Sequence, residues 1–295
     1  YPIRASNGVN LKGTGIDARE TRKYHCAQCA IGCGGIVSLE GVARAKGTFT
    51  HSHKPEYETL AAFGPLLLNS DADSILYINE LLNRAGMDSI SAGGTVAFAI
   101  ECYENGLLTP EQTGGLDLTW GNHEAIIALV EQMISRETWL GDVLADGSKH
   151  AAEIIGKGSQ AYAITAGGQE PGMHDPRFDV GYGIDFSANA TPGRHTNGAV
   201  DYVTSFLWEH VSFAPEPQRV LKEDLTRPNP EYAQGTVLAF WYKMLIDGAG
   251  GCIFGTAGGV NAWNLFEMLE LATGWGKTPD EYMHIGNRIN TLRQL

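Results

Sequence analysis

Four of the five cysteines form a pattern that suits a metal site. Cys26, Cys29 and Cys33 lie in the run Cys-Ala-Gln-Cys-Ala-Ile-Gly-Cys, and Cys252 lies far downstream. Thiolates are soft ligands, and a short loop can supply three of the four that a cubane iron–sulfur cluster needs. The fourth must then come from another part of the chain. The spacing therefore predicts a [4Fe-4S] cluster held by these four cysteines.

The order of the spacings separates this pattern from other cysteine motifs. The bacterial ferredoxin run has Cys-x2-Cys-x2-Cys before a Cys-Pro, and radical enzymes that cleave S-adenosylmethionine place x3 before x2. A structural zinc site with four cysteines is the main alternative. Such sites usually contain two Cys-x2-Cys pairs, whereas this chain contains one. The pattern favours iron over zinc without excluding zinc.

The composition is that of a globular protein with an acidic surface. The 295 residues carry a formal net charge of −13, and binding to nucleic acid would need a basic face. No run approaches about 18 consecutive apolar residues, so the sequence predicts no membrane span. The chain begins without a hydrophobic leader, and cysteines kept as ligands suit a reducing compartment. We therefore expect a cytoplasmic protein.

The elements that position these residues are expected to be mainly helices. Asp71 or Asp73 can cap a helix that ends near Gly86, and Ser91 can open a second helix that ends near Gly106. Both segments carry apolar residues at helical spacing.

Four further signals continue this pattern. Asn122 can cap a third helix, and residues 142–155 can form another. A long helix is expected over residues 230–246, and Thr278 with Glu281 makes a capping box for the last helix.

The helical periodicity is lost where Gly and Pro gather between Ala163 and Arg177. This change places a domain boundary near residue 165, and a loop-rich stretch is expected from there to about residue 197. We expect one helical domain over residues 1–165 and a second over residues 166–295.

Seven short motifs occur in a fixed order along the chain. They are Cys26-x2-Cys-x3-Cys-Gly34, Pro55-Glu-Tyr-Glu-Thr59, Asn83-Arg-Ala-Gly-Met-Asp-Ser-Ile-Ser91, Trp120-Gly-Asn122, His174-Asp-Pro-Arg177, Thr191-Pro-Gly-Arg-His-Thr196 and Asp247-x2-Gly-Gly-Cys252. With these motifs the chain resembles the tungsten-containing aldehyde:ferredoxin oxidoreductases over essentially its whole length.

The resemblance implies two helical domains packed around a buried bis-pterin tungsten cofactor and a [4Fe-4S] cluster. Molybdenum is an alternative to tungsten, and a magnesium ion bridging the pterin phosphates is a further candidate. The implied reaction oxidises a small aldehyde to a carboxylic acid, and the electrons pass through the cluster to ferredoxin.

The family's two pterin turns follow the pattern Asp-x2-Gly-Leu-(Asp/Cys). By resemblance, the first turn corresponds to Asn83, Gly86, Met87 and Asp88, and the second to Asp247, Gly250, Gly251 and Cys252. Glycine lets backbone N–H groups approach a flat heterocycle, and a carboxylate can accept hydrogen bonds from its amino groups. Asn83 and Gly251 depart from the pattern. An ordinary helix end with a glycine after its last turn is the alternative interpretation of either turn alone.

The resemblance assigns acid–base chemistry to Glu58 and His195. Glu58 would activate water or the hydrated aldehyde as general base, and His195 would donate a hydrogen bond to the carbonyl oxygen. Without the resemblance, Glu58 is typical of a carboxylate at a helix N-terminus. Gly93 and Gly94 can serve either the approach of a cofactor or the packing of helices.

Members of the family are considerably longer, and their N-terminal β-rich domain has no counterpart in the sequence. We expect a portion of a longer polypeptide or one half of a split enzyme, completed by the missing domain or a partner chain. Self-association into a homo-oligomer is a further hypothesis. Three other functions stay open: a non-catalytic iron–sulfur electron-transfer subunit, a related tungsten enzyme that reduces aromatic acyl-CoA, and a structural zinc protein.

Overall fold

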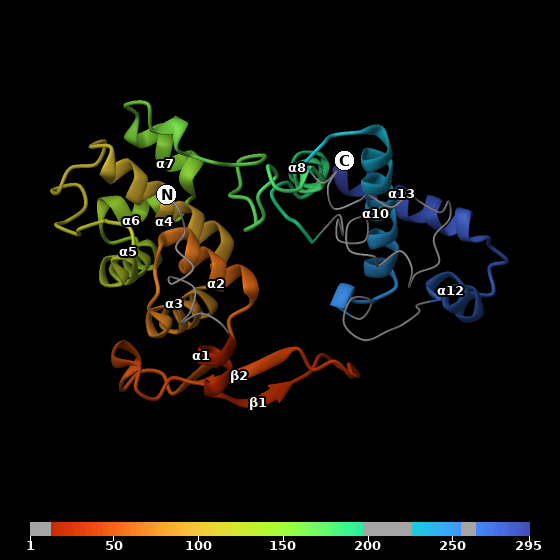
Figure 1. Cartoon of the computed structure of the whole chain (residues 1–295), viewed down its shortest axis with the longest axis horizontal. Coiled ribbons are helices and arrows are strands. Elements are labelled where there is room, and N and C mark those ends of the chain that lie inside the picture. The colour runs from red at the N-terminus through yellow and green to blue at the C-terminus, as the bar shows by residue number, and fades with distance from the viewer. Residues whose placement is uncertain (1–12, 197–225, 255–263) are drawn as a thin grey trace. The chain divides into compact units, whose positions relative to one another are not determined.

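The computed structural model describes residues 13–196, 226–254 and 264–295. The chain divides into two compact units, residues 1–173 and 174–295, and helices dominate both (Figure 1). Each unit has its own cluster of buried apolar side chains. The boundary expected near residue 165 lies within a loop of the first unit.

The first unit opens with a small antiparallel sheet of three strands in the order β1-β2-β3. The strands are β1 (Glu20–Tyr24), β2 (Gly34–Ser38) and β3 (His51–His53). Asn79 ties this sheet to the helices, because its amide donates to Ser52 Oγ at 3.0 Å and to the His53 carbonyl at 2.8 Å. These strands were not predicted from the sequence. β1 is mostly exposed and lacks the alternation that marks a half-buried strand.

Seven α-helices follow or flank this sheet within the described part of the first unit. They are α1 (Gly13–Ile16), α2 (Tyr57–Phe63), α3 (Ala72–Ala85), α4 (Ser89–Glu104), α5 (His123–Ser135), α6 (Trp139–Ala145) and α7 (Ser148–Ile155). Short 3-10 helices are η2 (Asp17–Arg19), η3 (Ala43–Ala45), η4 (Pro65–Leu67) and η5 (Ser159–Ala161).

Helix α4 is the centre of the first unit. It contacts α2, α5, α6 and α7 and buries residues on all of its sides, as a core helix does. A Cβ atom at Gly93 would lie 2.6 Å from the Ala62 Cβ of α2, so glycine is what lets these two helices approach. Gly93 therefore serves helix packing.

The second unit is built around a long helix. Its described helices are α8 (Val180–Ala188), α10 (Pro230–Gly248), α12 (Leu265–Thr273) and α13 (Pro279–Gln294), and α10 packs against both α13 and α8 (Figure 1). A Cβ atom at Gly286 would lie 2.0 Å from the Trp241 carbonyl oxygen. Glycine therefore permits the close crossing of α13 and α10.

Local capping signals predicted both ends of α3 and the starts of α5 and α13 correctly. Asp71 accepts from the Ser74 amide at the start of α3, and Gly86 ends that helix with a left-handed φ of 67°. Asn122 caps α5. Thr278 and Glu281 form both bonds of the capping box that opens α13.

Three expectations about helices were wrong. Asp88, not Ser91, caps the second helix, since its carboxylate accepts the Ser91 amide at 2.9 Å. Residues 142–155 form two helices, because Gly147 adopts a φ of 91° between them. Helix α8 lies in a stretch interpreted as loop, where buried Asp179 caps it and accepts the Tyr232 hydroxyl.

Candidate functional site

The three clustered cysteines lie on one hairpin loop. Strands β1 and β2 pair so that Tyr24 faces Gly34, and residues 25–33 form the loop between them. The Cys29 amide donates to the Cys26 carbonyl at 3.0 Å, which closes a turn in which Gln28 has a left-handed φ of 59°. The sheet therefore holds Cys26, Cys29 and Cys33 within one short, closed loop.

His25 braces this loop. Its Nδ1 lies 3.1 Å from the Cys29 carbonyl oxygen, within hydrogen-bond distance. A Cβ atom at Gly32 would lie 2.6 Å from the ring, so only glycine fits beneath the imidazole there. His25 thus fixes the loop between the second and third cysteines, a role that the sequence analysis missed.

The five free thiols fall into two environments. Cys26, Cys33 and Cys252 are exposed and Cys29 is half-buried, whereas Cys102 is fully buried in the last turn of α4. Burial, with a smaller contribution from the charge of Glu101, raises the pKa of Cys102 to about 12. Because a metal ligand must be a thiolate, Cys102 does not belong to the candidate ligand set.

The two turns assigned to the pterins share two backbone features. Each begins in the last turn of a long helix and contains a left-handed glycine, Gly86 with a φ of 67° and Gly250 with a φ of 74°. The Met87 amide donates to the Leu82 carbonyl at 3.1 Å, five residues back. At the equivalent place the Gly251 amide donates to the Ile246 carbonyl at 2.8 Å.

This hydrogen-bond pattern is that of a helix C-terminus, the alternative interpretation raised from the sequence. It leaves the last residue of each turn, Asp88 and Cys252, exposed to solvent. A Cβ atom at Gly86 or Gly250 would meet nothing within 4 Å, so the space beside each turn is open. Glycine is favoured at both positions by the left-handed backbone conformation and not by a close neighbour.

The first residues of the two turns differ in charge. Asp247 forms an ion pair with Lys243 of α10, with nitrogen–oxygen distances of 2.6 and 2.7 Å. Lys243 is almost fully buried, so its ammonium group sits at the edge of the core. Asn83 is exposed at the corresponding position and carries no charge.

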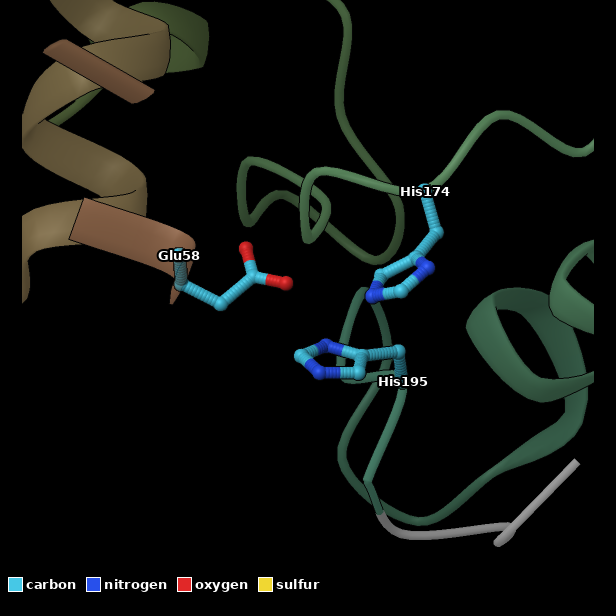
Figure 2. A group of neighbouring side chains, drawn as sticks. All are labelled: Glu58, His174 and His195. Atoms are coloured by element: carbon cyan, nitrogen blue, oxygen red, sulfur yellow. The ribbon is translucent and has the colours of Figure 1, made fainter. Parts of the chain in front are cut away.

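Glu58 is held in the first turn of α2. Its Oε2 accepts a hydrogen bond from the Met173 amide at 2.8 Å, and the neighbouring Tyr57 hydroxyl donates to the Met173 carbonyl at 3.0 Å. Both backbone polar groups of Met173 are therefore bound by the start of α2. Figure 2 shows the Glu58 side chain extending from this end of the helix.

The predicted His195 lies against a second imidazole. Within the second unit the ring centroids of His174 and His195 are 4.2 Å apart, and His174 stacks on Tyr182 at 4.3 Å. The loops before and after α8 carry the two histidines, as Figure 2 shows. His174 occurs in a motif quoted from the sequence, but no role was assigned to it.

The donor atoms present suit the groups that the sequence implies. Three thiols share one surface loop, and the equivalent turns end in an exposed carboxylate and an exposed thiol. Soft sulfur ligands fit an iron–sulfur cluster, and carboxylates fit the amino groups of a pterin. Within the described residues, no helix has the length and apolar character that a membrane span requires.

A family model described as "Aldehyde ferredoxin oxidoreductase, domains 2 & 3" matches residues 5–295. The chain is 33% identical over 279 residues to a tungsten-containing aldehyde ferredoxin oxidoreductase of Thermococcus kodakarensis, and 32% identical over 275 residues to one of Pyrococcus furiosus. Each alignment covers 93% of this chain and 42% of the relative. The chain thus spans less than half the length of these curated relatives.

Two more distant proteins are also similar. The chain is 28% identical over 274 residues to the "Aliphatic sulfonate oxidoreductase, WOR-like subunit" of Pyrococcus furiosus, covering 90% of this chain and 38% of that protein. The solved "Active site complex BamBC of Benzoyl Coenzyme A reductase in complex with 1,5 Dienoyl-CoA" matches with a TM-score of 0.65 and 19% identity. That match covers 94% of this chain and 44% of the other, and it shows a shared fold.

Proposed function

Because the chain belongs to the aldehyde ferredoxin oxidoreductase family, we propose that it forms the cofactor-binding part of an enzyme that oxidises aldehydes to carboxylic acids. The net reaction converts an aldehyde and water into a carboxylic acid, two electrons and two protons. Its support is the family match over residues 5–295 and the names of the relatives that share 32–33% identity. The rest of the enzyme, on the same or a separate polypeptide, is part of this proposal.

Two turns and four cysteines would hold the cofactors. Residues 83–88 and 247–252 would each bind one pyranopterin of a tungsten or molybdenum centre, which supplies the two-electron chemistry when bound. Cys26, Cys29, Cys33 and Cys252 would ligate a [4Fe-4S] cluster that supplies one-electron transfer, with ferredoxin as the acceptor.

Glu58 is the proposed general base. The single geometric observation that carries this role is the 2.8 Å hydrogen bond from the Met173 amide to Glu58 Oε2, which fixes the carboxylate. Glu58 would take a proton from water, or from the hydrated form of the aldehyde, as the carbon–oxygen bond forms. A base held in one orientation loses less entropy at this step than a mobile one.

His195 is proposed to donate a hydrogen bond to the oxygen of the aldehyde carbonyl. This donation draws charge toward the oxygen and makes the carbonyl carbon easier to attack. The His174 ring, 4.2 Å away between centroids, restricts the orientation of His195. We therefore assign substrate orientation to His195 and a supporting role to His174.

Elemental analysis of the anaerobically purified natural protein tests the cofactors. About four iron atoms with tungsten or molybdenum per chain would support the proposal. Iron without either metal would favour an electron-transfer subunit, and zinc alone would overturn the cluster assignment. Aldehyde-dependent reduction of a viologen dye, measured beside reduction of an aromatic acyl-CoA, then decides the substrate class.

The variant Glu58→Gln tests the general base. We expect iron and tungsten contents to stay at the wild-type level while kcat falls by about 10²–10⁴-fold, the usual contribution of a positioned base. Glu267→Gln, at an exposed position on α12, is a matched control with the same chemical change. Wild-type turnover by Glu58→Gln would rule out Glu58 as the base.

A further inference from the structure

Glu170 is a buried carboxylate outside all seven sequence motifs. Glu170 is 3% exposed, and its Oε1 atom accepts three hydrogen bonds inside the first unit. The donors are the Ser148 amide at 2.7 Å, the Ser148 hydroxyl at 2.6 Å and the Thr95 hydroxyl at 3.3 Å. A charge buried this deeply is costly unless such donors surround it, so its place in the fold is closely defined.

This carboxylate caps a helix from a distant part of the chain. Helix α7 begins at Ser148, and Gly147 before it has no side chain with which to cap the helix. Glu170, 22 residues further on, accepts the Ser148 amide instead. The positive end of the helix dipole also favours a carboxylate at this position.

Two glycines make the room that Glu170 occupies. A Cβ atom at Gly94 of α4 would lie 2.9 Å from the Glu170 Cβ and Cγ atoms. A Cβ atom at Gly147 would lie 3.3 Å from Glu170 Oε1. The site that receives Glu170 is thus formed jointly by α4 and the start of α7.

The segment that Glu170 anchors leads directly to the proposed base. Pro171 and Gly172 separate Glu170 from Met173, whose amide donates to Glu58 Oε2 and whose carbonyl accepts the Tyr57 hydroxyl. The short span is fixed at one end by Glu170 and at the other by the start of α2. A shift of Glu170 would therefore move the Met173 amide away from Glu58.

We propose that Glu170 is a positioning residue for the general base: by holding residues 170–173 against α4 and α7, it presents the Met173 amide to Glu58. This inference rests on the proposed function for its catalytic consequence. Its structural part, the dependence of the Met173 hydrogen bond on Glu170, stands separately. Glu170 acts only through Met173.

Amide hydrogen exchange in the full natural protein tests the structural part. Glu170→Ala is expected to raise the exchange rate of the Met173 amide by about tenfold or more, because loss of the anchor frees the segment. Glu170→Gln keeps an oxygen acceptor of the same size and is expected to restore most of the protection. Thr113→Val removes a comparably buried hydroxyl elsewhere in the unit and is expected to leave Met173 unchanged.

Kinetics test the catalytic part. In Glu170→Ala we expect kcat to fall by about tenfold with KM changed by less than about twofold, since a misplaced base slows the chemical step. The acid limb of the pH–rate profile is expected to move to higher pH, because an amide that no longer donates to the carboxylate stops favouring its charged form. Glu170→Gln and Thr113→Val should keep the wild-type profile.

Each outcome decides one part of the inference. Unchanged Met173 exchange in folded Glu170→Ala overturns the structural part and with it the whole inference. An altered exchange with an unaltered pH profile in an active enzyme overturns the catalytic part. If Glu170→Ala does not fold, the pair Thr95→Val and Ser148→Ala removes two of the three donors. That pair must then raise Met173 exchange by about threefold, or the inference fails. A wild-type protein without aldehyde oxidation refutes the proposed function, while the exchange data still decide the role of Glu170.

Discussion

Residues of one type acquire different chemistry from where the fold places them, as the cysteines show. Cys102 lies within α4 with no exposed surface, and burial raises the pKa of its thiol to about 12. Cys26 and Cys33 lie on an exposed hairpin loop of the same unit. The first environment suppresses thiolate formation, whereas the second leaves the sulfur open to reagents in solution.

Alkylation of the metal-free protein with iodoacetamide at pH 8 is expected to label Cys26 and Cys33 and to spare Cys102. Because burial raises the thiol pKa to about 12, about one Cys102 in ten thousand is a thiolate at pH 8, and burial also keeps the reagent from the sulfur. Peptide mass spectrometry measures each site. Equal labelling rates at Cys102 and Cys26 in folded protein would contradict the environments described.

At the scale of single elements, the capping box of α13 links sequence to stability. Thr278→Ala removes the hydroxyl that accepts the Glu281 amide and is expected to cost about 1 kcal/mol of unfolding free energy. Thermal or denaturant unfolding measures the loss. Ser187→Ala at the end of α8 is a control, because its hydroxyl bonds only within its own helix and caps nothing.

The same box predicts a dependence on pH. Hydrogen bonds from the Thr278 amide and then its hydroxyl hold the pKa of Glu281 below its ordinary value of 4.5. A carboxyl with a lowered pKa stabilises the fold above pH 4.5, and that contribution is lost as the pH falls through the folded-state pKa. The stability difference between wild type and Glu281→Gln should therefore shrink below pH 4.5. A difference that is constant from pH 7 to pH 3 would exclude this effect.

Local rules predicted the helices that depend on their own residues. The caps at Asp71, Asn122 and Thr278 follow from side chains that bond within three residues of themselves. The start of α7 at Ser148 was missed because its cap comes from Glu170, a residue remote in sequence. Tertiary contacts decided that case, and periodicity cannot register them.

The candidate site likewise contains residues that local patterns indicate and residues that only the fold brings into place. Residue type and spacing indicated the cysteine set, and resemblance indicated Glu58 and His195. Neither indicated Met173 or Glu170, since a backbone amide and an isolated carboxylate leave no motif. The pairing of β1 with β2 on either side of the cysteine loop could not be predicted from the sequence either, because β1 is short and polar.

At the scale of the whole molecule, the proposed cluster would take ligands from distant parts of the sequence. Cys26, Cys29 and Cys33 lie near its start and Cys252 lies near its end. A ligand that binds only the folded state adds its binding free energy to stability. A cluster with this ligand set would therefore add to the free energy of unfolding of the chain.

Anaerobic calorimetry of the natural protein measures that contribution. With iron and sulfide bound, we expect the melting temperature to rise, and Cys252→Ser should lose most of the rise. In metal-free protein the same variant should melt as wild type does, because Cys252 is exposed. Identical melting of the iron-loaded wild type and Cys252→Ser would refute the fourth ligand.

The turns at the ends of α3 and α10 share backbone features but carry different side chains. A left-handed glycine and one amide bond to a carbonyl five residues back define the six-residue frame in both places. Its final position carries an oxygen donor in one copy, Asp88, and a sulfur donor in the other, Cys252. The two turns thus share this part of their backbone while their last side chains differ, a hard oxygen ligand in one turn and a soft sulfur ligand in the other.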